Sequence, residues 1–447
     1  MASTYLHSNT GTATNAKKFT LSMWIKRAKL CDSNSQRFYQ GYKDGNDRVY
    51  VMFDNTGGTP DAIWIYAVTG GTVELYWTSN RRFRDTNGWY HFVFSADSTQ
   101  AAQADRFKVY VNGVEETSWT KTNNPSQNID WGNQLAQTNN TLTISGTESH
   151  TQLFDGSMSH IHFIDGTAYD ASAFGSTDST TGEWKINTSP SVTYGNNGYF
   201  ILKDGNSVTD SSPNSNDFSV GAGTLTKTED CPSNVFATFL SITNLSNVSY
   251  ANGNNKMTST SGWSWSPSTI CPSKGKFYTE FKSAQGSDPI YTSFGVVPYA
   301  VWKDMNNEAI GAGANSESGS VGYGHAGNVT KGNSTQYTGS SYGYSDVVGV
   351  AVDLDNNKVY FSKNGVWQNS GDPTSGSTGT GAVSLDSTYD TWAIASSTTQ
   401  SAYVNYGNGY FGTTQISSEG TNASGIGKFE YDVPTGYTAL STKGLNE

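Results

Sequence analysis

The segment from Asp346 to Trp367, which reads DVVGVAVDLDNNKVYFSKNGVW, constrains the fold of this chain more than any other stretch. Its larger apolar side chains recur at every second position and therefore share one face of an extended strand. They are Val348, Val350, Val352 and Leu354. The opposite face carries small or apolar residues, so both faces can be buried inside a sandwich of two sheets. Asp355–Lys358 and Asn364-Gly365 supply turns on either side of a returning strand, which predicts a β-meander in a sandwich core.

The same segment, extended to DVVGVAVDLDNNKVYFSKNGVWQNSG, resembles the central hairpin of SPRY domains, a concanavalin-like β-sandwich family. The run of valines, the Asp-Leu-Asp turn and the Phe-x-x-Asn-Gly-Val step carry the resemblance. The resemblance implies a sandwich fold and a habit of binding through loops. It does not imply an enzyme.

The length and composition suit a chain of many short strands. The chain has 447 residues, which is too many for one ordinary sandwich and fits two domains of about 200 residues each. Only 15% of residues are charged, whereas 13% are aromatic and 48 are Gly, which favours strands joined by tight turns. No long window shows a sustained 3.6-residue apolar period, so we expect almost no helix.

Four motifs in the first half resemble successive motifs of laminin-G/concanavalin A-like modules. They are FTLSMWIKR, GWYHFVFSAD, FKVYVNGV and FDGSMSHIHFIDGTAYD. More narrowly, residues 1–235 resemble the version of this module found in virion proteins of tailed phages of the marine or cyanophage-like type. The C-terminal FEYDVPTGYTALSTKGLNE resembles the end of the SPRY-like module in the same proteins. The resemblance implies a protein of the virion surface or tail that is made in the host cytoplasm.

We therefore predict an all-β protein with two concanavalin-like antiparallel β-sandwich (jelly-roll) domains. Residues 1–169 would form the laminin-G/concanavalin A-like sandwich, and residues 236–447 the SPRY-like sandwich. Residues 170–235 connect them and carry large anchors such as Trp184 and Phe200. A free linker would not carry such anchors, so we expect the connecting segment to fold back on the first domain.

The two halves contain similar hairpin sequences. Lys108–Val114 reads KVYVNGV, and Lys358–Val366 reads KVYFSKNGV. Each follows an apolar strand that ends in Asp. The similarity fits a duplicated architecture, but it also fits the common use of Asn-Gly turns in unrelated sandwiches.

The carboxylates argue against an enzyme. Glycan hydrolases of concanavalin-like fold need a pair of carboxylates at short, fixed spacing. The chain has one Glu-x-Asp, Glu430-Tyr431-Asp432, but Pro434 and Thr435 stand where the acid of that pattern belongs. We therefore predict no enzymatic activity. A glycan hydrolase is the less favoured alternative, because the sequence lacks the general acid that this mechanism needs.

Metal ligands are sparse. His160 and His162 fall on one predicted strand face with Met158 and Ile164, but no third ligand follows at close spacing on that face, which favours a packed or hydrogen-bonded pair. Laminin-G relatives often bind calcium through loops, which makes the loop carboxylates candidates, although such residues are usually turn formers. They are Asp44, Asp47, Asp97 and Asp105. We expect no cofactor, and calcium stays open as the alternative.

Aromatic residues in the loops of the second half are the best candidates for binding. Exposed aromatic rings can stack on sugars or anchor a protein contact. We expect exposure at Tyr299, Trp302, Tyr342 and Tyr344. Trp263 and Trp265 share one face of a strand and are expected to pack inward.

Several partners are excluded by charge and hydropathy. The net charge is −11, and no basic run exceeds Lys17-Lys18 and Arg81–Arg84, so a nucleic-acid partner is not expected. No apolar run approaches the ~20 residues that span a bilayer, and the N-terminus has no signal pattern. Cys31, Cys231 and Cys271 are too widely spaced for a disulfide framework. Whether Cys231 and Cys271 pair stays open.

These observations predict a non-enzymatic structural protein of a phage virion. As a tail fibre, spike or adhesin-type component, it would bind a host-surface glycan or protein through sandwich loops. The alternative is a capsid decoration or tail-assembly protein that contacts only other virion proteins. In either case we expect a homo-oligomer or a multicopy protein on the particle.

Overall fold

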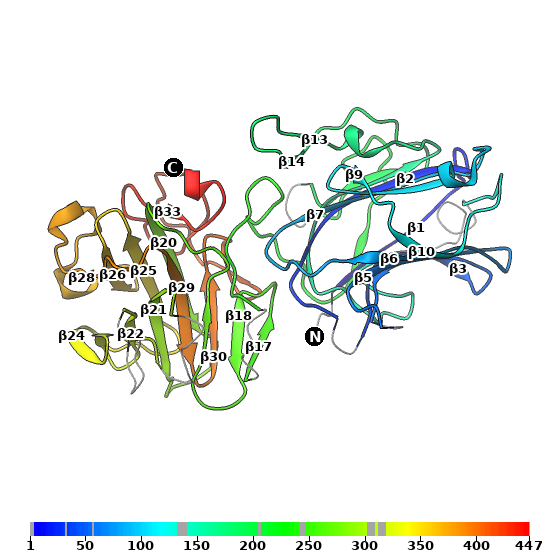
Figure 1. The fold of residues 1–447 in the computed structure, drawn as a ribbon. Coiled ribbons are helices and arrows are strands. Elements are labelled where there is room, and N and C mark those ends of the chain that lie inside the picture. The colour runs from blue at the N-terminus through cyan, green and yellow to red at the C-terminus, as the bar shows by residue number, and fades with distance from the viewer. Residues whose placement is uncertain are drawn as a thin grey trace. The chain divides into compact units, whose positions relative to one another are not determined.

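A computed structural model describes residues 4–31, 34–55, 58–131, 141–203, 207–241, 247–301, 309–311 and 319–446. The chain is 44% strand and 4% helix, which confirms the predicted all-β fold. It divides into two compact units, Met1–Lys227 and Thr228–Glu447 (Figure 1). The helical segments of the described residues are short 3-10 helices: Gln103–Asp105, Ala171–Ala173, Gln368–Ser370, Pro373–Thr378 and Gly444–Asn446.

The first unit is built from two large antiparallel sheets. The eight-stranded sheet runs in the order β10-β6-β5-β4-β3-β11-β1-β16. Its strands are β10 (Trp119–Asn123), β6 (Thr72–Arg82), β5 (Ala62–Thr69), β4 (Asp47–Phe53), β3 (Gln36–Asp44), β11 (Thr141–Ile144), β1 (Tyr5–Asn9) and β16 (Ser219–Ala222). The six-stranded sheet comprises β15 (Tyr199–Ile201), β12 (Gly156–Asp165), β2 (Lys18–Arg27), β7 (Tyr90–Asp97), β8 (Phe107–Val111) and β9 (Val114–Glu115). A small pair, β13 (Gly175–Thr177) and β14 (Trp184–Ile186), lies apart from both.

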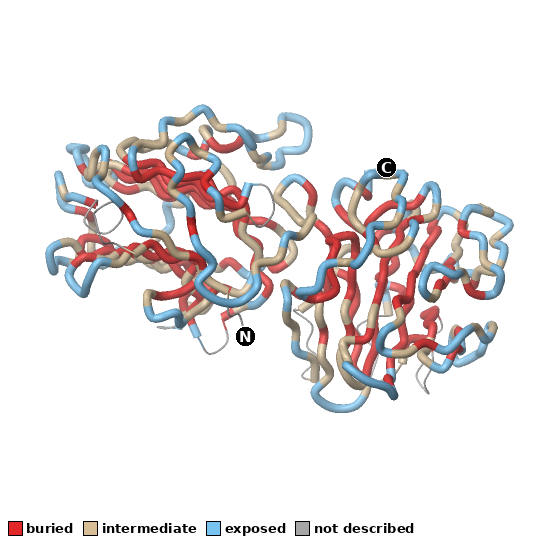
Figure 2. Tube along the Cα trace, turned by 180° about the vertical axis from the view of Figure 1, so that it is seen from behind, coloured by how far each residue is buried: buried red, intermediate tan, exposed pale blue. Residues whose placement is uncertain are grey.

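The core of the first unit lies between its two large sheets. The alternate apolar side chains of β2 are buried in this core; they are Phe19, Leu21, Met23 and Ile25. Phe92 and Phe94 of β7 join them from the same sheet, and Ile63 and Ile65 of β5 come from the facing sheet. Figure 2 shows the buried stretches following the strands while exposed stretches follow the turns.

Residues 166–197 cover the outer face of the six-stranded sheet. The indole Nε1 of Trp184 donates a 2.9 Å hydrogen bond to Nδ1 of His91, a fully buried residue of β7. Nε2 of His91 lies 2.9 Å from the Ser22 hydroxyl, so both ring nitrogens are engaged. Of the predicted connecting segment, residues 170–227 belong to the first unit and residues 228–235 to the second.

The second unit also has two large sheets. The nine-stranded sheet contains β17 (Val248–Ala251), β18 (Lys256–Ser259), β30 (Ser401–Asn405), β20 (Lys276–Ser283), β25 (Val347–Asp353), β26 (Lys358–Lys363), β27 (Val366–Trp367), β28 (Val383–Ser384) and β33 (Thr438–Ala439). The six-stranded sheet runs β19 (Ser264–Pro267), β29 (Trp392–Thr398), β21 (Thr292–Pro298), β22 (Val321–Gly324), β23 (Asn328–Lys331) and β24 (Ser334–Thr338). A small hairpin joins β31 (Tyr410–Phe411) to β32 (Thr414–Gln415).

The meander predicted from Asp346–Trp367 is confirmed as β25, β26 and β27. Its alternate apolar residues are buried between the sheets, as predicted; they are Val348, Val350, Val352 and Leu354. The small face of β25 is buried as well, since Ala351 packs in a second cluster with Phe429 and Tyr437. Residues after β30 thus cover the outer face of this sheet.

Candidate functional site

Four aromatic side chains gather on the outer face of the eight-stranded sheet in the first unit. We name this surface the aromatic face; it consists of Tyr50, Trp64, Tyr66 and Tyr76. Their sequence neighbours, such as Val49, Ile65 and Leu75, are buried in the core between the sheets. Because successive side chains alternate across a strand, the four rings point to the other side. Their strands are neighbours, and β5 and β6 can be followed in Figure 1.

The strand register brings these rings together. Tyr66 on β5 lies opposite Tyr50 on β4 and opposite Tyr76 on β6. The ring centroids of Tyr50 and Tyr66 are 5.1 Å apart at an interplanar angle of 23°, and those of Tyr66 and Tyr76 are 5.7 Å apart. Trp64 contacts Tyr76 at 5.4 Å and lies edge-on to Tyr50 at 5.9 Å. All four rings are half-buried, so they form one continuous surface that solvent still reaches.

Two arginines lie against this surface. The guanidinium carbon of Arg37 is 3.9 Å from the centroid of Tyr50, and that of Arg48 is 5.6 Å from the centroid of Tyr66. Both contacts are in the range of cation–π attraction. Burial raises the pKa of the Tyr50 phenol to about 12, although the nearby Arg37 lowers it, so the phenol stays a hydrogen-bond donor at neutral pH.

The aromatic face also carries polar groups that the protein leaves unused. The indole Nε1 of Trp64 is buried and has no hydrogen-bond partner among the described residues. The hydroxyls of Tyr50, Tyr66 and Tyr76 make no hydrogen bond within the described part of the chain. Ring surface combined with free donors at its edges is the chemistry that accommodates a sugar ring and its hydroxyls.

The sequence analysis did not identify this surface. The signal was present, because aromatic residues occupy the outward positions of three consecutive strands at Tyr50, Trp64, Tyr66 and Tyr76. Such positions are usually polar in a sheet that faces water. Only the register, however, shows that the four rings meet.

The predicted binding residues of the second unit do not come together. Tyr299 and Tyr344 are exposed, at 47% and 42%, as predicted. Trp302 lies outside the described residues. The backbone N–H of Tyr344 bonds to Asp288 before the start of β21, whereas Tyr299 follows the end of that strand. A seven-residue strand at roughly 3.3 Å per residue therefore separates them.

The prediction that Tyr342 is exposed is wrong. Only 5% of Tyr342 is accessible, and its ring packs against Phe294 and Tyr323 in the core of the second unit. Its hydroxyl donates to the carbonyls of Thr292 and Tyr323, at 3.1 Å and 2.9 Å. The aromatic ring thus closes the end of the sandwich instead of facing solvent. Trp265 is buried as predicted, and Trp263 is half-buried.

The Glu-x-Asp motif is occupied by loop hydrogen bonds. Glu430 accepts a 2.8 Å bond from the Ser417 hydroxyl, and Asp432 accepts bonds from the backbone and hydroxyl of Thr421. Those bonds hold the pKa of Asp432 below its usual value. A second acid, the fully buried Glu280, lies near Glu430, but its carboxyl oxygens accept the backbone N–H groups of Glu430 and Tyr431 at 2.8 Å each.

The candidate calcium ligands are also used by their own turns. Asp97 accepts bonds from Thr99 and Gln100 and pairs with Lys18 at 3.0 Å. Asp105 pairs with Lys108 at 2.9 Å. Asp44 and Asp47 likewise accept backbone N–H groups of the β3–β4 and β5–β6 hairpins. The described residues contain no group of three or more His, Cys, Asp or Glu side chains arranged to hold a metal ion.

The predicted face shared by Met158, His160, His162 and Ile164 is broken. The register of β12 shifts between Ser159 and His162, where His160 adopts a φ of 46°. As a result Met158 packs on the core between the sheets, whereas Ile164 packs on the outer cluster. His162 lies under the covering segment, with Nδ1 2.9 Å from the Tyr194 hydroxyl, and burial lowers its pKa well below the usual value.

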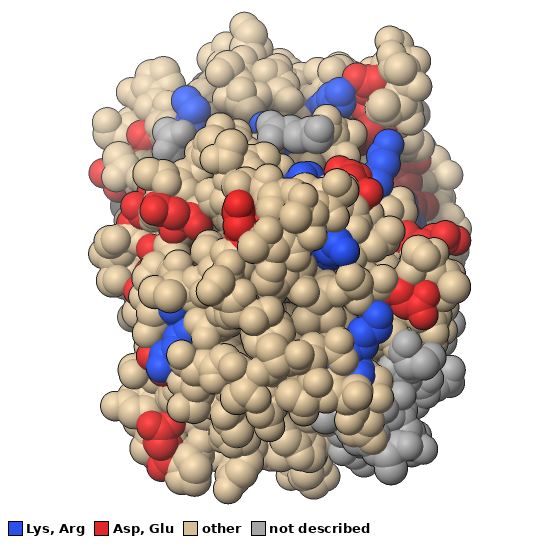
Figure 3. Space-filling model, turned by 90° about the vertical axis from the view of Figure 1, so that its left-hand side faces the viewer, with Lys and Arg blue, Asp and Glu red and all other residues tan. Residues whose placement is uncertain are grey.

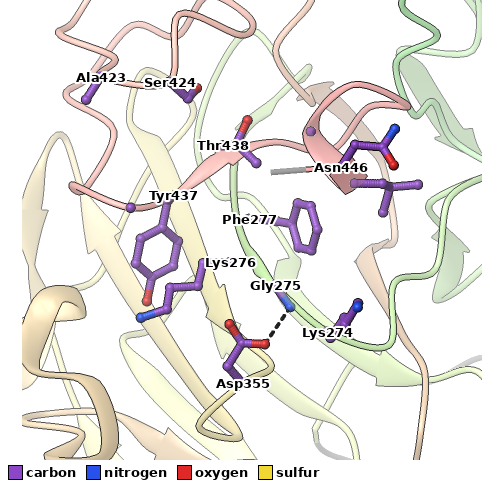
Figure 4. Close-up of a pocket in the computed structure, with 13 residues that line it drawn as sticks. Lys274, Gly275, Lys276, Phe277, Asp355, Ala423, Ser424, Tyr437, Thr438 and Asn446 are labelled. Carbon is purple, nitrogen blue, oxygen red and sulfur yellow. Dashed lines mark hydrogen bonds between the residues drawn. The ribbon is translucent and has the colours of Figure 1, made fainter.

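A shallow pocket of about 700 Å³ lies in the second unit (Figure 4). The start of β20 and the C-terminal loops line it, and Phe277, Tyr437 and Thr438 form its buried part. Asp355 contributes a carboxylate that accepts a 2.9 Å bond from the Gly275 N–H. Among the described lining residues it is the single carboxylate, so the pocket offers no acid–base pair.

The charge distribution, the cysteines and the helices of the described residues indicate no further functional site. On the face of the second unit in Figure 3, Lys and Arg are interspersed with Asp and Glu among many uncharged residues. Cys31, Cys231 and Cys271 are all free thiols. Within the described ranges, no helix has the length and apolar character needed to cross a membrane.

Comparison with known proteins agrees with this architecture. Residues 1–173 match the family model described as the concanavalin A-like lectin/glucanases superfamily, so the first unit contains a laminin-G/concanavalin-like module. No curated protein matches the chain.

Solved structures provide further likenesses. The chain is similar to the SPRY domain of human HERC1, with 14% identity over 35% of this chain and 91% of that chain and a TM-score of 0.28. It is similar to domain 4 of AbnA, a GH43 extracellular arabinanase from Geobacillus stearothermophilus, in complex with arabinotriose, with 18% identity over 35% and 64% of the two chains and a TM-score of 0.25. A heptameric SAP-like pentraxin from Limulus polyphemus matches with 12% identity over 37% and 78%, at a TM-score of 0.25. At these TM-scores the likenesses carry no functional argument.

Proposed function

We propose that this chain is a non-enzymatic binding protein that holds a glycan against the aromatic face. The carrying observation is the set of four half-buried rings on one sheet surface, from Tyr50 to Tyr76. Folding alone gives no reason to place such rings on the outward side, because each strand already buries its other face in the core. A sugar ring that stacks on them would bury apolar surface on both partners.

The protein's polar groups would add specificity to this contact. The free Nε1 of Trp64 and the tyrosine hydroxyls can donate to sugar oxygens. A buried donor without a partner costs about 1–3 kcal/mol, and a ligand that satisfies it recovers part of that cost. The site is a surface built on sheet strands, so it needs no loop closure to bind.

The test is binding of the purified full chain to an array of polysaccharides. We expect Trp64→Ala and Tyr66→Ala each to weaken glycan binding by about tenfold or more, because each removes a ring that the ligand would cover. Tyr344→Ala is the control, since it removes an exposed aromatic ring from the second unit. Loss of binding in Tyr344→Ala with retention in Trp64→Ala would refute the assignment to the aromatic face.

We further propose that binding occurs without chemistry. Incubation with a bound polysaccharide should release no reducing ends, because Glu430 and Asp432 are held by hydrogen bonds of their own loops and Glu280 is fully buried. Release of reducing ends that Glu430→Gln abolishes would contradict this proposal.

The biological setting that we propose is the virion of a tailed phage, as a tail fibre, spike or adhesin-type component. The support is the sequence resemblance, together with a rigid sheet surface suited to adhesion. A capsid decoration or tail-assembly protein is the second candidate, and the pair of sandwiches supports it equally. Imaging of intact particles with a labelled antibody against the chain separates the two: label on the tail supports the adhesin, and label over the capsid supports decoration.

A further inference from the structure

The aromatic face carries arginines that are not neutralised by carboxylates. Arg37 donates to the side-chain oxygens of Gln40 and Gln152, the latter at 3.0 Å. Arg48 donates to the Gly45 carbonyl. All of these acceptors are neutral. No carboxylate lies within ion-pair distance of either guanidinium in the described part of the chain.

Several other cations of the same unit are paired with carboxylates. Arg27 and Arg84 contact the carboxylate of Asp61, at 3.0 Å and 3.1 Å. Lys18 pairs with Asp97. In a chain of net charge −11, acidic groups are plentiful, so two arginines on this surface without a carboxylate at ion-pair distance add positive charge to it.

Two acidic groups near this surface accept hydrogen bonds from other residues. Glu148 accepts a hydrogen bond from Gln40, the residue that also accepts from Arg37. Glu74 of β6 is buried and accepts a 2.9 Å bond from the Ser126 N–H. Neither carboxylate forms an ion pair with Arg37 or Arg48. Burial lowers the pKa of Arg37, and the nearby charge of Glu148 acts in the opposite direction.

The stacking geometry prepares the guanidinium groups for a ligand. Arg37 and Arg48 are held against Tyr50 and Tyr66, so less side-chain freedom is lost when they bind. A planar guanidinium recognises a carboxylate or a sulfate through paired N–H donors. The stacked ring and the guanidinium would then contact one sugar and its charged substituent together.

We infer that the ligand of the aromatic face is an acidic polysaccharide, whose rings stack on the tyrosines and whose carboxylate or sulfate groups meet Arg37 and Arg48. This inference rests on the proposed function and names the chemical class of its ligand. Because the whole chain is negatively charged, non-specific attraction to an acidic polymer is disfavoured. Binding therefore requires this local positive site.

Matched polymer pairs test the inference. The full chain is titrated with polygalacturonate and with its neutral methyl ester, and with dextran sulfate and neutral dextran. We expect at least one acidic polymer to bind about tenfold more tightly than its neutral partner, and raising salt from about 50 to 200 mM to weaken that binding. The two pairs distinguish a carboxylate from a sulfate as the recognised group.

Three variants assign the effect to residues. Arg48→Gln should remove most of the preference for the acidic polymer, whereas Trp64→Ala should weaken both members of a pair. Lys185→Gln makes the same change of charge on the covering segment of the other sheet, and it should leave binding unchanged.

The other possible results would contradict the acidic ligand, the aromatic face as its site, or the proposed function. Equal binding of charged and neutral partners overturns the acidic ligand and leaves the proposed function standing. Acidic binding that survives Trp64→Ala overturns the aromatic face as the site. A chain that binds no member of either pair overturns the acidic ligand, and a negative result on the full polysaccharide array would overturn the proposed function as well.

Discussion

The first and second units carry the same hairpin, and the comparison shows which of its features are shared. In each unit a strand ends in an Asp that pairs with a Lys of the neighbouring strand at 3.0 Å: Asp97 with Lys18, and Asp353 with Lys276. The turn that follows the return strand is Asn112-Gly113 in one unit and Asn364-Gly365 in the other, with φ values of 49° and 82° against 48° and 77°.

Even the hydrogen bonds of these turns agree. Asn112 accepts from the N–H of His91 at 2.8 Å and donates its own N–H to the His91 carbonyl. Asn364 makes the same pair of bonds with Val347, at 2.9 Å and 2.8 Å. Both turns are then covered by a ring from a later segment, Trp184 or Tyr431. Shared sandwich geometry suffices to explain this agreement, and so does duplication.

The units differ in how the covering segment is held. In the first unit a neutral bond joins Trp184 to the buried imidazole of His91. In the second unit the carboxylate of Glu280, fully buried on β20, accepts the backbone N–H groups of Glu430 and Tyr431 at 2.8 Å each. The covering segment is therefore attached to its sheet by a neutral hydrogen bond in the first unit and by an ionisable acid in the second unit.

The two units differ again on the outer face of their second large sheet, which is the eight-stranded sheet in the first unit and the six-stranded sheet in the second unit. The first unit presents half-buried aromatic rings there, whereas in the second unit Trp265 is buried beside small residues such as Ser293 and Ser397. Ile310 packs on that face through bonds to Ser293 and Ser397, and a Cβ on Gly322 would lie 2.0 Å from the Ile310 carbonyl. In the second unit this face is thus covered around Ile310, whereas the rings of the aromatic face in the first unit stay accessible.

The largest effect is expected from a charge placed in a core. Val350→Asp should prevent cooperative folding of the second unit, because an unpaired buried carboxylate costs several kcal/mol of a domain's typical ~5–15 kcal/mol. Hydrogen exchange of peptides from both units would show protection lost in the second unit and kept in the first. Val366→Asp, at a residue 68% exposed in the same meander, is the control. Native protection of β20 in Val350→Asp would place Val350 outside the core.

The covered turns should be the next most sensitive positions. An alanine Cβ at Gly113 would lie 2.3 Å from the Trp184 ring, and one at Gly365 would lie 2.7 Å from Tyr431. We expect Gly113→Ala to cost about 3 kcal/mol and Gly365→Ala about 2 kcal/mol, since each adds a displaced ring to the roughly 1–2 kcal/mol of a positive φ.

Uncovered glycines provide the controls for these variants. Gly182 and Gly436 have φ values of 74° and 84° and no atom within 4 Å of an added Cβ. Their alanine variants should show the backbone cost alone in chemical unfolding. Equal costs at Gly113 and Gly182 would mean that Trp184 does not press on the turn.

The two covering devices should respond to pH in opposite directions. Burial lowers the pKa of His91 from 6.5 to about 3. Below pH 6.5 the unfolded chain therefore binds a proton that the native state does not bind, and the stability of the first unit decreases as the pH is lowered. Burial raises the pKa of Glu280 from 4.5 to about 7, against the lowering effect of its backbone hydrogen bonds, so between these values the native state keeps a proton that the unfolded chain loses. Its contribution therefore falls as pH rises.

Hydrogen exchange between pH 5 and 6.5, corrected for intrinsic exchange rates, measures the contributions of His91 and Glu280 to the stability of their units. Each slope is at most about 1.4 kcal/mol per pH unit. His91→Gln should flatten the first unit's dependence, and Glu280→Gln that of the second. The difference between variant and wild type isolates each group from others such as Asp155, whose pKa burial also raises. Unchanged slopes in both variants would contradict the assignment.

The smallest effect is expected on the aromatic face. Tyr76→Ala should lower the free energy of unfolding by only about 1 kcal/mol, because the ring is half-buried and its neighbours stay in contact. Tyr323→Ala, which removes a fully buried ring from the core of the second unit, should cost about 3–5 kcal/mol in the same assay. A comparable loss for Tyr76→Ala would make the aromatic face a structural element.

Much of the fold could be predicted because its signals are local. The alternation of Val348, Val350 and Val352 needs only the two-residue period of a strand, and Asn364-Gly365 needs only the positive φ that those residues accept. The bulge in β12 was missed, because nothing in the local pattern around His160 marks an extra residue. The aromatic face was missed because its rings come from three strands whose register is not a local property.

By itself, the sequence determined which segments are strands, where the hairpins turn and which side of each strand is apolar, since these follow from side-chain size and backbone preference within a few residues. The tertiary structure alone decided which outward faces are covered. Tyr342 and Tyr344 are two positions apart with the same side chain, yet Tyr342 is 5% exposed and Tyr344 is 42% exposed. Tyr342 is buried because Phe294 and Tyr323, both distant in sequence, pack around it. Exposure, and with it the place of a binding surface, depends on such non-local contacts.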